Sequence, residues 1–66
     1  MQENTALPCI PFGKIKRFGE FGPPYQVGRA VRGLPDGDWL VEITLIQTGE
    51  TTDYRLSRLL DDPEAC

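Results

Sequence analysis

The chain has 66 residues, with ten acidic and seven basic side chains, a net charge of −3, two Cys and no His. A chain of this length forms one domain and buries only about 60% of the surface that its unfolded form exposes. It lacks the clustered Cys or His residues that zinc sites and disulfide frameworks require, so we expect neither a metal nor a cofactor.

Charge is distributed unevenly along the chain. Residues 1–33 carry a net charge of +3 and residues 34–66 a net charge of −6, which produces either a dipolar surface for a charged partner or two solvated faces. No apolar run approaches the roughly 18 residues that span a bilayer, and residues 1–5 lack the basic start of a signal peptide. We therefore expect a cytoplasmic protein in which Cys9 and Cys66 are free thiols, although the sequence leaves their pairing open.

The N-terminal part contains two prolines, Pro8 and Pro11, which disfavour a helix. Residues 1–12 are predicted to form an extended arm, and residues 13–66 a single small β domain. A short strand is expected over residues 14–18, because glycines and prolines follow it closely and indicate a loop up to Pro24.

Side chains alternate with a period of two from Tyr25 onward. This pattern predicts a strand with Tyr25, Val27, Arg29 and Val31 on one face, and Gly28 marks either a bulge or a close approach of another backbone. The Pro-Asp-Gly-Asp sequence that follows predicts a turn over residues 34–38.

Residues 39–46 are the strongest strand candidate, with Trp39, Val41, Ile43 and Leu45 pointing into the core. Burying four such side chains contributes roughly 1.5–3 kcal/mol each. A second turn, with Gly49 in the left-handed conformation, leads into a strand over residues 51–56.

A single helical turn is expected next, capped by Ser57 and ended by Pro63, with leucines closing one end of the sheet. These leucines are Leu56, Leu59 and Leu60. The predicted fold is mainly β: a small antiparallel meander curled into an SH3-like barrel, with a short C-terminal helical turn. An open sheet with a helical turn is the fallback.

The carboxylates give no convincing catalytic or metal site. Asp36 and Asp38 lie in a turn, where Asp side chains usually bond to backbone amides, and the acidic residues at 61–64 suit a solvated helix end. Without His, a Ser or Cys nucleophile lacks its usual activating base, and no phosphate-binding glycine motif is present. We therefore predict that the chain is not an enzyme.

Cations and aromatic rings are interleaved over residues 14–25. The main hypothesis is a module that binds a protein partner or self-associates through Phe18, Phe21 and Tyr25 and through an exposed sheet edge. The alternative is nucleic-acid binding, in which bases stack on the rings and phosphates meet basic side chains, namely Lys14, Lys16, Arg17, Arg29 and Arg32. In the simplest interpretation, these rings pack into the core and the cations face water.

The stretch Gly-x-Ile-Lys-Arg-Phe-Gly-Glu-x-Gly-Pro-x-Tyr-x-Val-Gly at residues 13–28 resembles a family of very small bacterial proteins known only as a domain of unknown function. The resemblance continues through residues 36–41, 48–50 and 54–65. It implies a bacterial, intracellular protein and assigns no activity or functional residues.

A second similarity concerns only size and architecture. The plasmid-type dihydrofolate reductases are similarly short SH3-like chains that share one site between subunits, but their Val-Gln-Ile-Tyr strand has no match at residues 52–55. An oligomeric enzyme is therefore a remote alternative.

Overall fold

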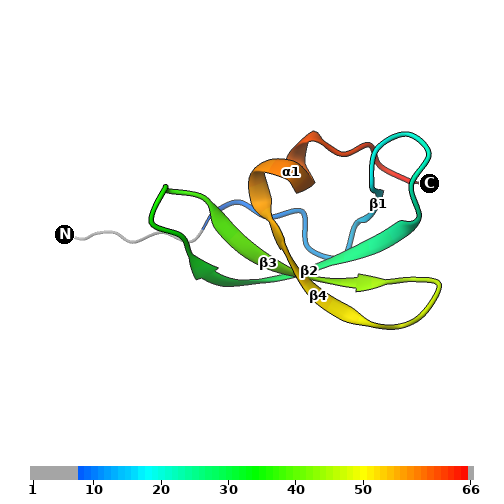
Figure 1. Cartoon of the computed structure of the whole chain (residues 1–66), viewed down its shortest axis with the longest axis horizontal. Coiled ribbons are helices and arrows are strands. Elements are labelled where there is room, and N and C mark those ends of the chain that lie inside the picture. Colours follow the sequence, from blue (N-terminus) through cyan, green and yellow to red (C-terminus); the bar gives the residue numbers. More distant parts are fainter. Residues whose placement is uncertain (1–7, 66) are drawn as a thin grey trace.

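Four antiparallel strands lie in the sheet in the same order as in the chain (Figure 1). In this computed structural model, which describes residues 8–65, the elements are β1 (Ile15–Arg17), β2 (Pro24–Gly33), β3 (Trp39–Leu45), β4 (Thr51–Arg55) and the helix α1 (Leu56–Asp61). The predicted mainly β meander with a short C-terminal helix is confirmed. No helix within residues 8–65 is both long and apolar enough to cross a membrane.

The core lies between the inner face of the sheet and α1. Val41 and Ile43 of β3 are fully buried, as the alternating pattern predicts, and Trp39 and Leu45 pack against them at the two ends of the strand. The other buried apolar residues are Tyr25 and Val27 of β2 and Leu56 and Leu59 of α1. Leu60 is 56% exposed, so the expectation that it closes the sheet is wrong.

A bulge interrupts β2 after Val27. Val27 pairs with Ile43 and Ala30 pairs with Val41, so two residues of β2 lie opposite Glu42 alone. This register confirms Gly28 as a bulge position. A Cβ atom there would lie 2.7 Å from the carbonyl oxygen of Glu42, so the two backbones also approach closely at this point.

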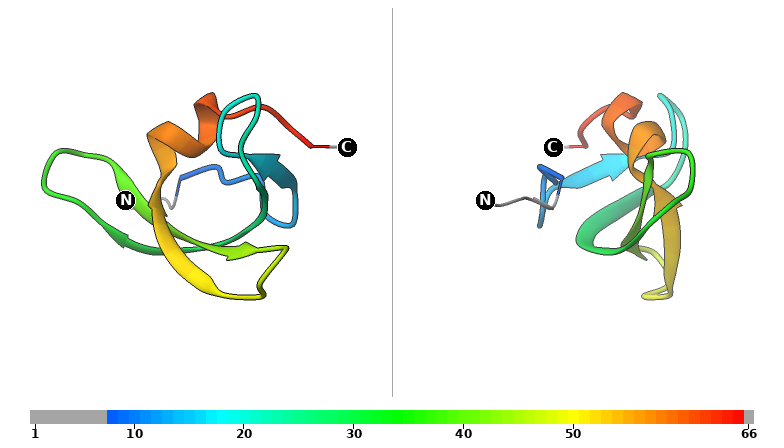
Figure 2. Two further views of the ribbon diagram at one scale, coloured as in Figure 1. Left: turned by 45° about the vertical axis from the view of Figure 1, so that its right-hand side comes forward. Right: turned by 90° about the vertical axis from the view of Figure 1, so that its left-hand side faces the viewer.

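The bulge also corrects the expected faces of β2. Because one extra residue exchanges the two faces of a strand, Ala30 lies opposite Val41 on the inner side of the sheet, where it is half-buried. Arg29 and Val31, which were expected beside Val27, are exposed instead. Figure 2 shows the resulting curvature of this long strand.

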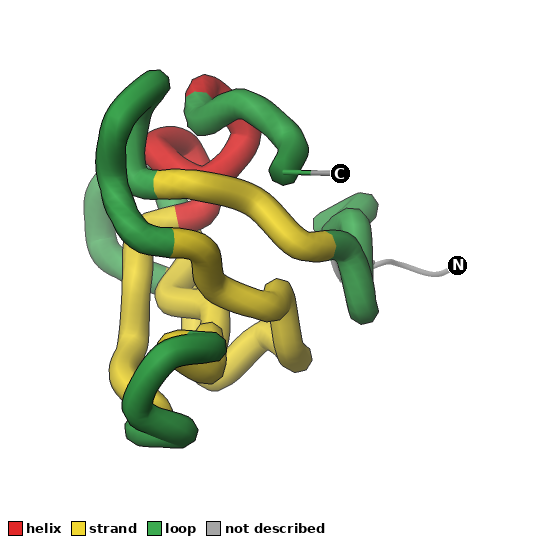
Figure 3. Tube along the Cα trace, turned by 90° about the vertical axis from the view of Figure 1, so that its right-hand side faces the viewer, coloured by secondary structure: helices red, strands yellow, loops and turns green. Residues whose placement is uncertain are grey.

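The sheet is not closed into a barrel. On its outer side β1 pairs with the C-terminal segment, where the Arg17 amide donates to the Pro63 carbonyl and the Ala65 amide donates to the Ile15 carbonyl. Within residues 8–65 no pairing joins β1 to β4. The expected SH3-like barrel is therefore corrected to an open, curved sheet covered by α1 and this C-terminal segment (Figure 3).

The two predicted hairpin turns are present, with Gly37 at φ 91° and Gly49 at φ 78°. In the N-terminal arm, residues 1–7 lie outside the described part of the chain, and Ile10 packs against the core. Cys9 is an exposed free thiol, whereas Cys66 lies outside the described residues, so their pairing stays untested.

Candidate functional site

The loop between β1 and β2, residues 18–23, is the most distinctive surface feature and is called here the aromatic loop. Its ends are joined by the Phe18 amide, which donates to the Pro23 carbonyl at 3.3 Å, and Arg17 Nη1 donates to the Gly22 carbonyl at 3.4 Å. A Cβ atom at Gly22 would lie 2.0 Å from the Phe18 carbonyl oxygen, so the turn is tight enough to require glycine. These contacts hold the two ends of the loop together and brace it.

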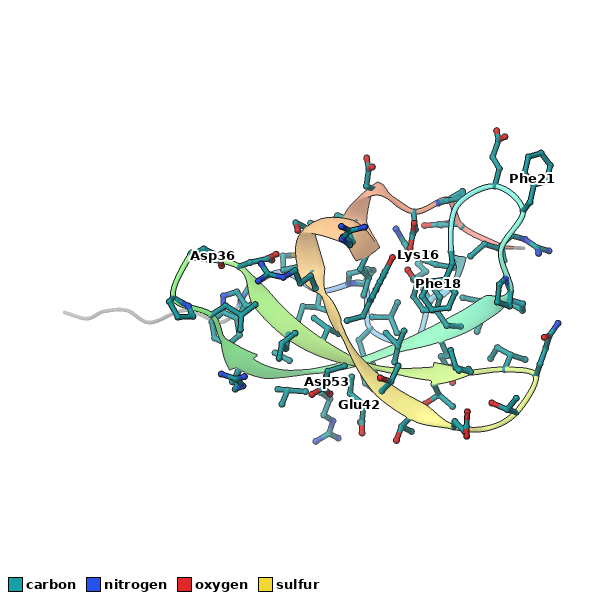
Figure 4. All side chains as sticks on the ribbon, viewed as in Figure 1. Lys16, Phe18, Phe21, Asp36, Glu42 and Asp53 are labelled. Atoms are coloured by element: carbon teal, nitrogen blue, oxygen red, sulfur yellow. The ribbon has the colours of Figure 1, made fainter. Side chains whose placement is uncertain are left out.

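Phe21 lies at the tip of this loop and is 96% exposed. Figure 4 shows its ring pointing away from the domain, whereas Phe18 turns back toward the sheet. Leaving a phenyl ring in water forgoes roughly 1.5–3 kcal/mol of burial energy. The fold itself does not use this side chain.

The other two predicted partner-binding rings belong to an aromatic cluster. The ring centroids of Phe18 and Tyr25 are 4.5 Å apart, and the ring of Tyr54 meets both edge-on at 5.2 and 5.6 Å. Tyr25 is fully buried, so the prediction that it contacts a partner is wrong, and Phe18 is half-buried against the core. These two rings therefore pack into or against the core, as the simplest interpretation of the sequence predicts.

Asp62, just beyond α1, ties this cluster to the helix end. Its Oδ2 accepts hydrogen bonds from the hydroxyls of Tyr25 at 2.7 Å and Tyr54 at 3.1 Å, and its Oδ1 accepts one from the Gly19 amide at 3.2 Å. Burial is the main cause that raises the pKa of both phenols above the ordinary value, and the hydrogen bond to the Asp62 carboxylate is the second.

Sequence reasoning missed this role because it assigned the acidic residues at 61–64 to solvent. A usable signal was present, since Tyr25 and Tyr54 both fall at inward-facing strand positions. A buried tyrosine hydroxyl needs a hydrogen-bond partner, and Asp62 provides it.

Lys16 is the buried cation of the core, with only 6% exposure. Its Nζ donates to the carbonyl oxygens of Leu59 at 2.8 Å and Asp62 at 2.9 Å. These are carbonyls at the end of α1, where a helix leaves acceptors unpaired and a positive charge is favourable. The expectation that Lys16 contacts nucleic acid is therefore wrong, because its ammonium group is enclosed and already bonded.

The remaining predicted cations are exposed but lie on two parts of the sheet. Lys14 directly precedes β1, and Arg17 is its last residue. Arg29 lies in the bulge of β2 and Arg32 lies beyond it, where β2 pairs only with β3 among the described residues. The five-residue basic surface expected from the sequence is thus divided, and it loses its central lysine.

A second polar cluster joins the β2–β3 turn to the start of α1. Arg55 Nη1 lies 2.7 Å from Asp36 Oδ2 and 3.3 Å from Asp38 Oδ2. Asp38 also accepts bonds from the amide and hydroxyl of Ser57 and from the Trp39 amide. The hydrogen bond from Ser57 lowers the pKa of Asp38, and the one from Arg55 lowers the pKa of Asp36.

This cluster corrects the predicted helix cap. α1 begins at Leu56, so Ser57 lies inside its first turn, and Arg55 at the cap position makes no side-chain cap bond. Asp38 supplies the missing acceptor from another part of the chain. Asp36 and Asp38 thus make structural contacts, as their place in a turn predicts.

The candidate site is a surface rather than a cavity. No pocket opens among residues 8–65, and the same residues contain no group of three or more His, Cys, Asp or Glu that would hold a metal ion.

Comparison with known proteins assigns the chain to a family. The sequence profile of a family of unknown function, DUF5397, matches residues 3–66. An uncharacterized protein of Haemophilus influenzae is 64% identical over 56 residues, which are 85% of this chain and 89% of the relative. The predicted resemblance to a small bacterial family is confirmed. The chain belongs to the DUF5397 family of unknown function.

Proposed function

We propose that this chain is a non-catalytic interaction module that inserts Phe21 into an apolar pocket of a protein partner. The observation that carries the proposal is the 96% exposure of this ring on a braced loop. Aromatic side chains are enriched in the cores of protein interfaces. Because the loop is held in place before binding, little conformational entropy is lost when the ring is buried.

Arg17 supports the same surface. It is exposed at the base of the aromatic loop and contacts the Gly22 carbonyl. Arginine beside an aromatic anchor is a combination found at energetically dominant interface positions. The proposed contact is therefore a phenyl ring that enters a pocket, with a guanidinium group near its rim.

The test replaces Phe21 by the photoreactive analogue p-benzoylphenylalanine in the full chain expressed in bacterial cells. Phe12, which is 64% exposed, provides the matched control position. After irradiation, we expect a crosslinked species of one defined mass from position 21 and much less of it from position 12. Excess unlabelled wild-type protein should compete for the partner and so reduce this crosslink, whereas excess Phe21→Ala protein should not.

The mass of the crosslinked species distinguishes another protein from a second copy of this chain. Phe21→Ala should change the melting temperature by no more than about 2 °C, because the ring buries almost no surface. Equal crosslinking from positions 12 and 21, or none at all, would contradict the proposal. A cytoplasmic location is part of the same proposal, and cell fractionation tests it.

A further inference from the structure

β4 forms one edge of the sheet. It pairs with β3 on one side, and within residues 8–65 no strand pairs with its other side. The Leu45 amide donates to the Glu50 carbonyl, which makes these two residues a hydrogen-bonded pair. Since such pairs alternate along an antiparallel ladder, the backbone groups of Thr51 and Asp53 point outward.

Two carboxylates lie side by side next to this edge. Glu42 of β3 pairs directly with Asp53 of β4, and both side chains are exposed on the face opposite α1 (Figure 4). This pair is of the non-hydrogen-bonded kind, in which opposing side chains are closest. The salt bridges formed within residues 8–65 join Arg55 to Asp36 and Asp38, so neither carboxylate of the pair takes part in one. On the β2 side Arg29 lies in the bulge opposite Glu42, whereas Asp53 lies on the edge strand itself.

Like charges directly opposite each other destabilise a sheet, and charges near an edge discourage unwanted pairing. If two copies of β4 paired about a two-fold axis near Asp53, they would bring four carboxylates together. Self-pairing is therefore disfavoured, whereas a strand that carries positive charge would relieve the repulsion.

We propose that the outer edge of β4 is a strand-addition site for an extended segment of another protein that carries Lys or Arg. The outward amide and carbonyl groups of Thr51 and Asp53 supply the backbone hydrogen bonds, as in other cases of strand addition. The added residue opposite Asp53 lies on the same face as that carboxylate and is the basic one. This surface is separate from the aromatic loop, and the inference goes beyond the function proposed above.

The ¹⁵N-labelled full chain is titrated with a nine-residue peptide in which lysine alternates with valine. The matched control peptide has glutamate in place of lysine. We expect the largest amide shifts, together with slowed hydrogen exchange, at Thr51 and Asp53, and at least tenfold weaker binding of the glutamate peptide. Affinity for the lysine peptide should fall as salt increases, because the contact is electrostatic.

Two variants separate the backbone from the charge contribution. Asp53→Pro removes an outward amide without removing a bond to β3, so the fold should persist while binding is lost. Asp53→Asn, combined with Glu42→Gln, keeps the edge but should bring the affinities for the two peptides within about threefold of each other. If the proline variant fails to fold, N-methylation of the lysine peptide on alternate residues provides the same test and should abolish binding.

Shifts outside β4, equal affinity for both peptides, or protection of Thr51 and Asp53 by dimerisation without peptide would each overturn the proposal. Phe21→Ala should leave peptide binding unchanged, so this result and that of the crosslinking experiment are independent.

Discussion

Replacing Asp62 tests the central claim about how this small domain is held together. In Asp62→Ala, the hydroxyls of Tyr25 and Tyr54 and the amide of Gly19 all lose their acceptor. Tyr25 is fully buried, so its unpaired hydroxyl alone should cost about 1–3 kcal/mol. The two more accessible donors should each add about 0.5–1 kcal/mol.

The expected total, about 3 kcal/mol, is a large part of the stability of such a chain. At roughly 0.05–0.15 kcal/mol per residue, a domain of this length is stable by about 3–10 kcal/mol. Because 1 kcal/mol shifts the melting temperature of a small domain by about 4–8 °C, Asp62→Ala should melt at least about 12 °C lower.

Urea unfolding monitored by circular dichroism, together with a double-mutant cycle with Tyr25→Phe, provides the assay. The cycle should give a coupling energy of at least about 1 kcal/mol, because the two side chains share one hydrogen bond. Asp61→Ala is the matched control, since Asp61 is exposed and adjacent. If Asp62→Ala unfolds within about 0.5 kcal/mol of the wild type, the described role of Asp62 is wrong.

Four further predictions concern the other polar contacts and the exposed cations. Lys16→Met should reduce the free energy of unfolding by about 2 kcal/mol, because two helix-end carbonyls lose a charged donor; unchanged urea unfolding would contradict this. The lowered pKa values of Asp36 and Asp38 mean that their stabilisation is present above the ordinary carboxyl pKa and is lost as the pH falls. The difference in melting temperature between Asp38→Ala and the wild type should therefore shrink as the pH falls below the ordinary carboxyl pKa of about 3.9. The raised pKa values of Tyr25 and Tyr54 mean that their stabilisation is present below the ordinary phenol pKa and is lost as the pH rises. The free energy of unfolding should therefore fall above about pH 10, and absorbance should show phenolate forming only as the protein unfolds. Nucleic-acid binding through the four exposed cations would require an oligonucleotide affinity that falls steeply with salt, and no binding at low salt would remove that alternative.

The strands and turns could be predicted because their signals are local. The alternation from Trp39 to Leu45 reports one buried face, and Gly37 and Gly49 supply the positive φ that the two hairpin turns require. Gly28 likewise marks the bulge in β2. Composition also identified the unusual aromatic loop, although only the structure distinguished the exposed Phe21 from the buried Tyr25.

The amino-acid sequence alone determined the family, the four strands, their order and the residues that form most of the core. Tertiary structure decided the roles of Lys16 and Asp62. Apart from Tyr54, their hydrogen-bond partners lie 37 to 46 residues away in the chain. It also decided that the sheet stays open, because residues 63–65 pair with the outer side of β1. Periodicity reports which face of an element is apolar; it carries no information on which distant donor meets which acceptor when those faces pack together.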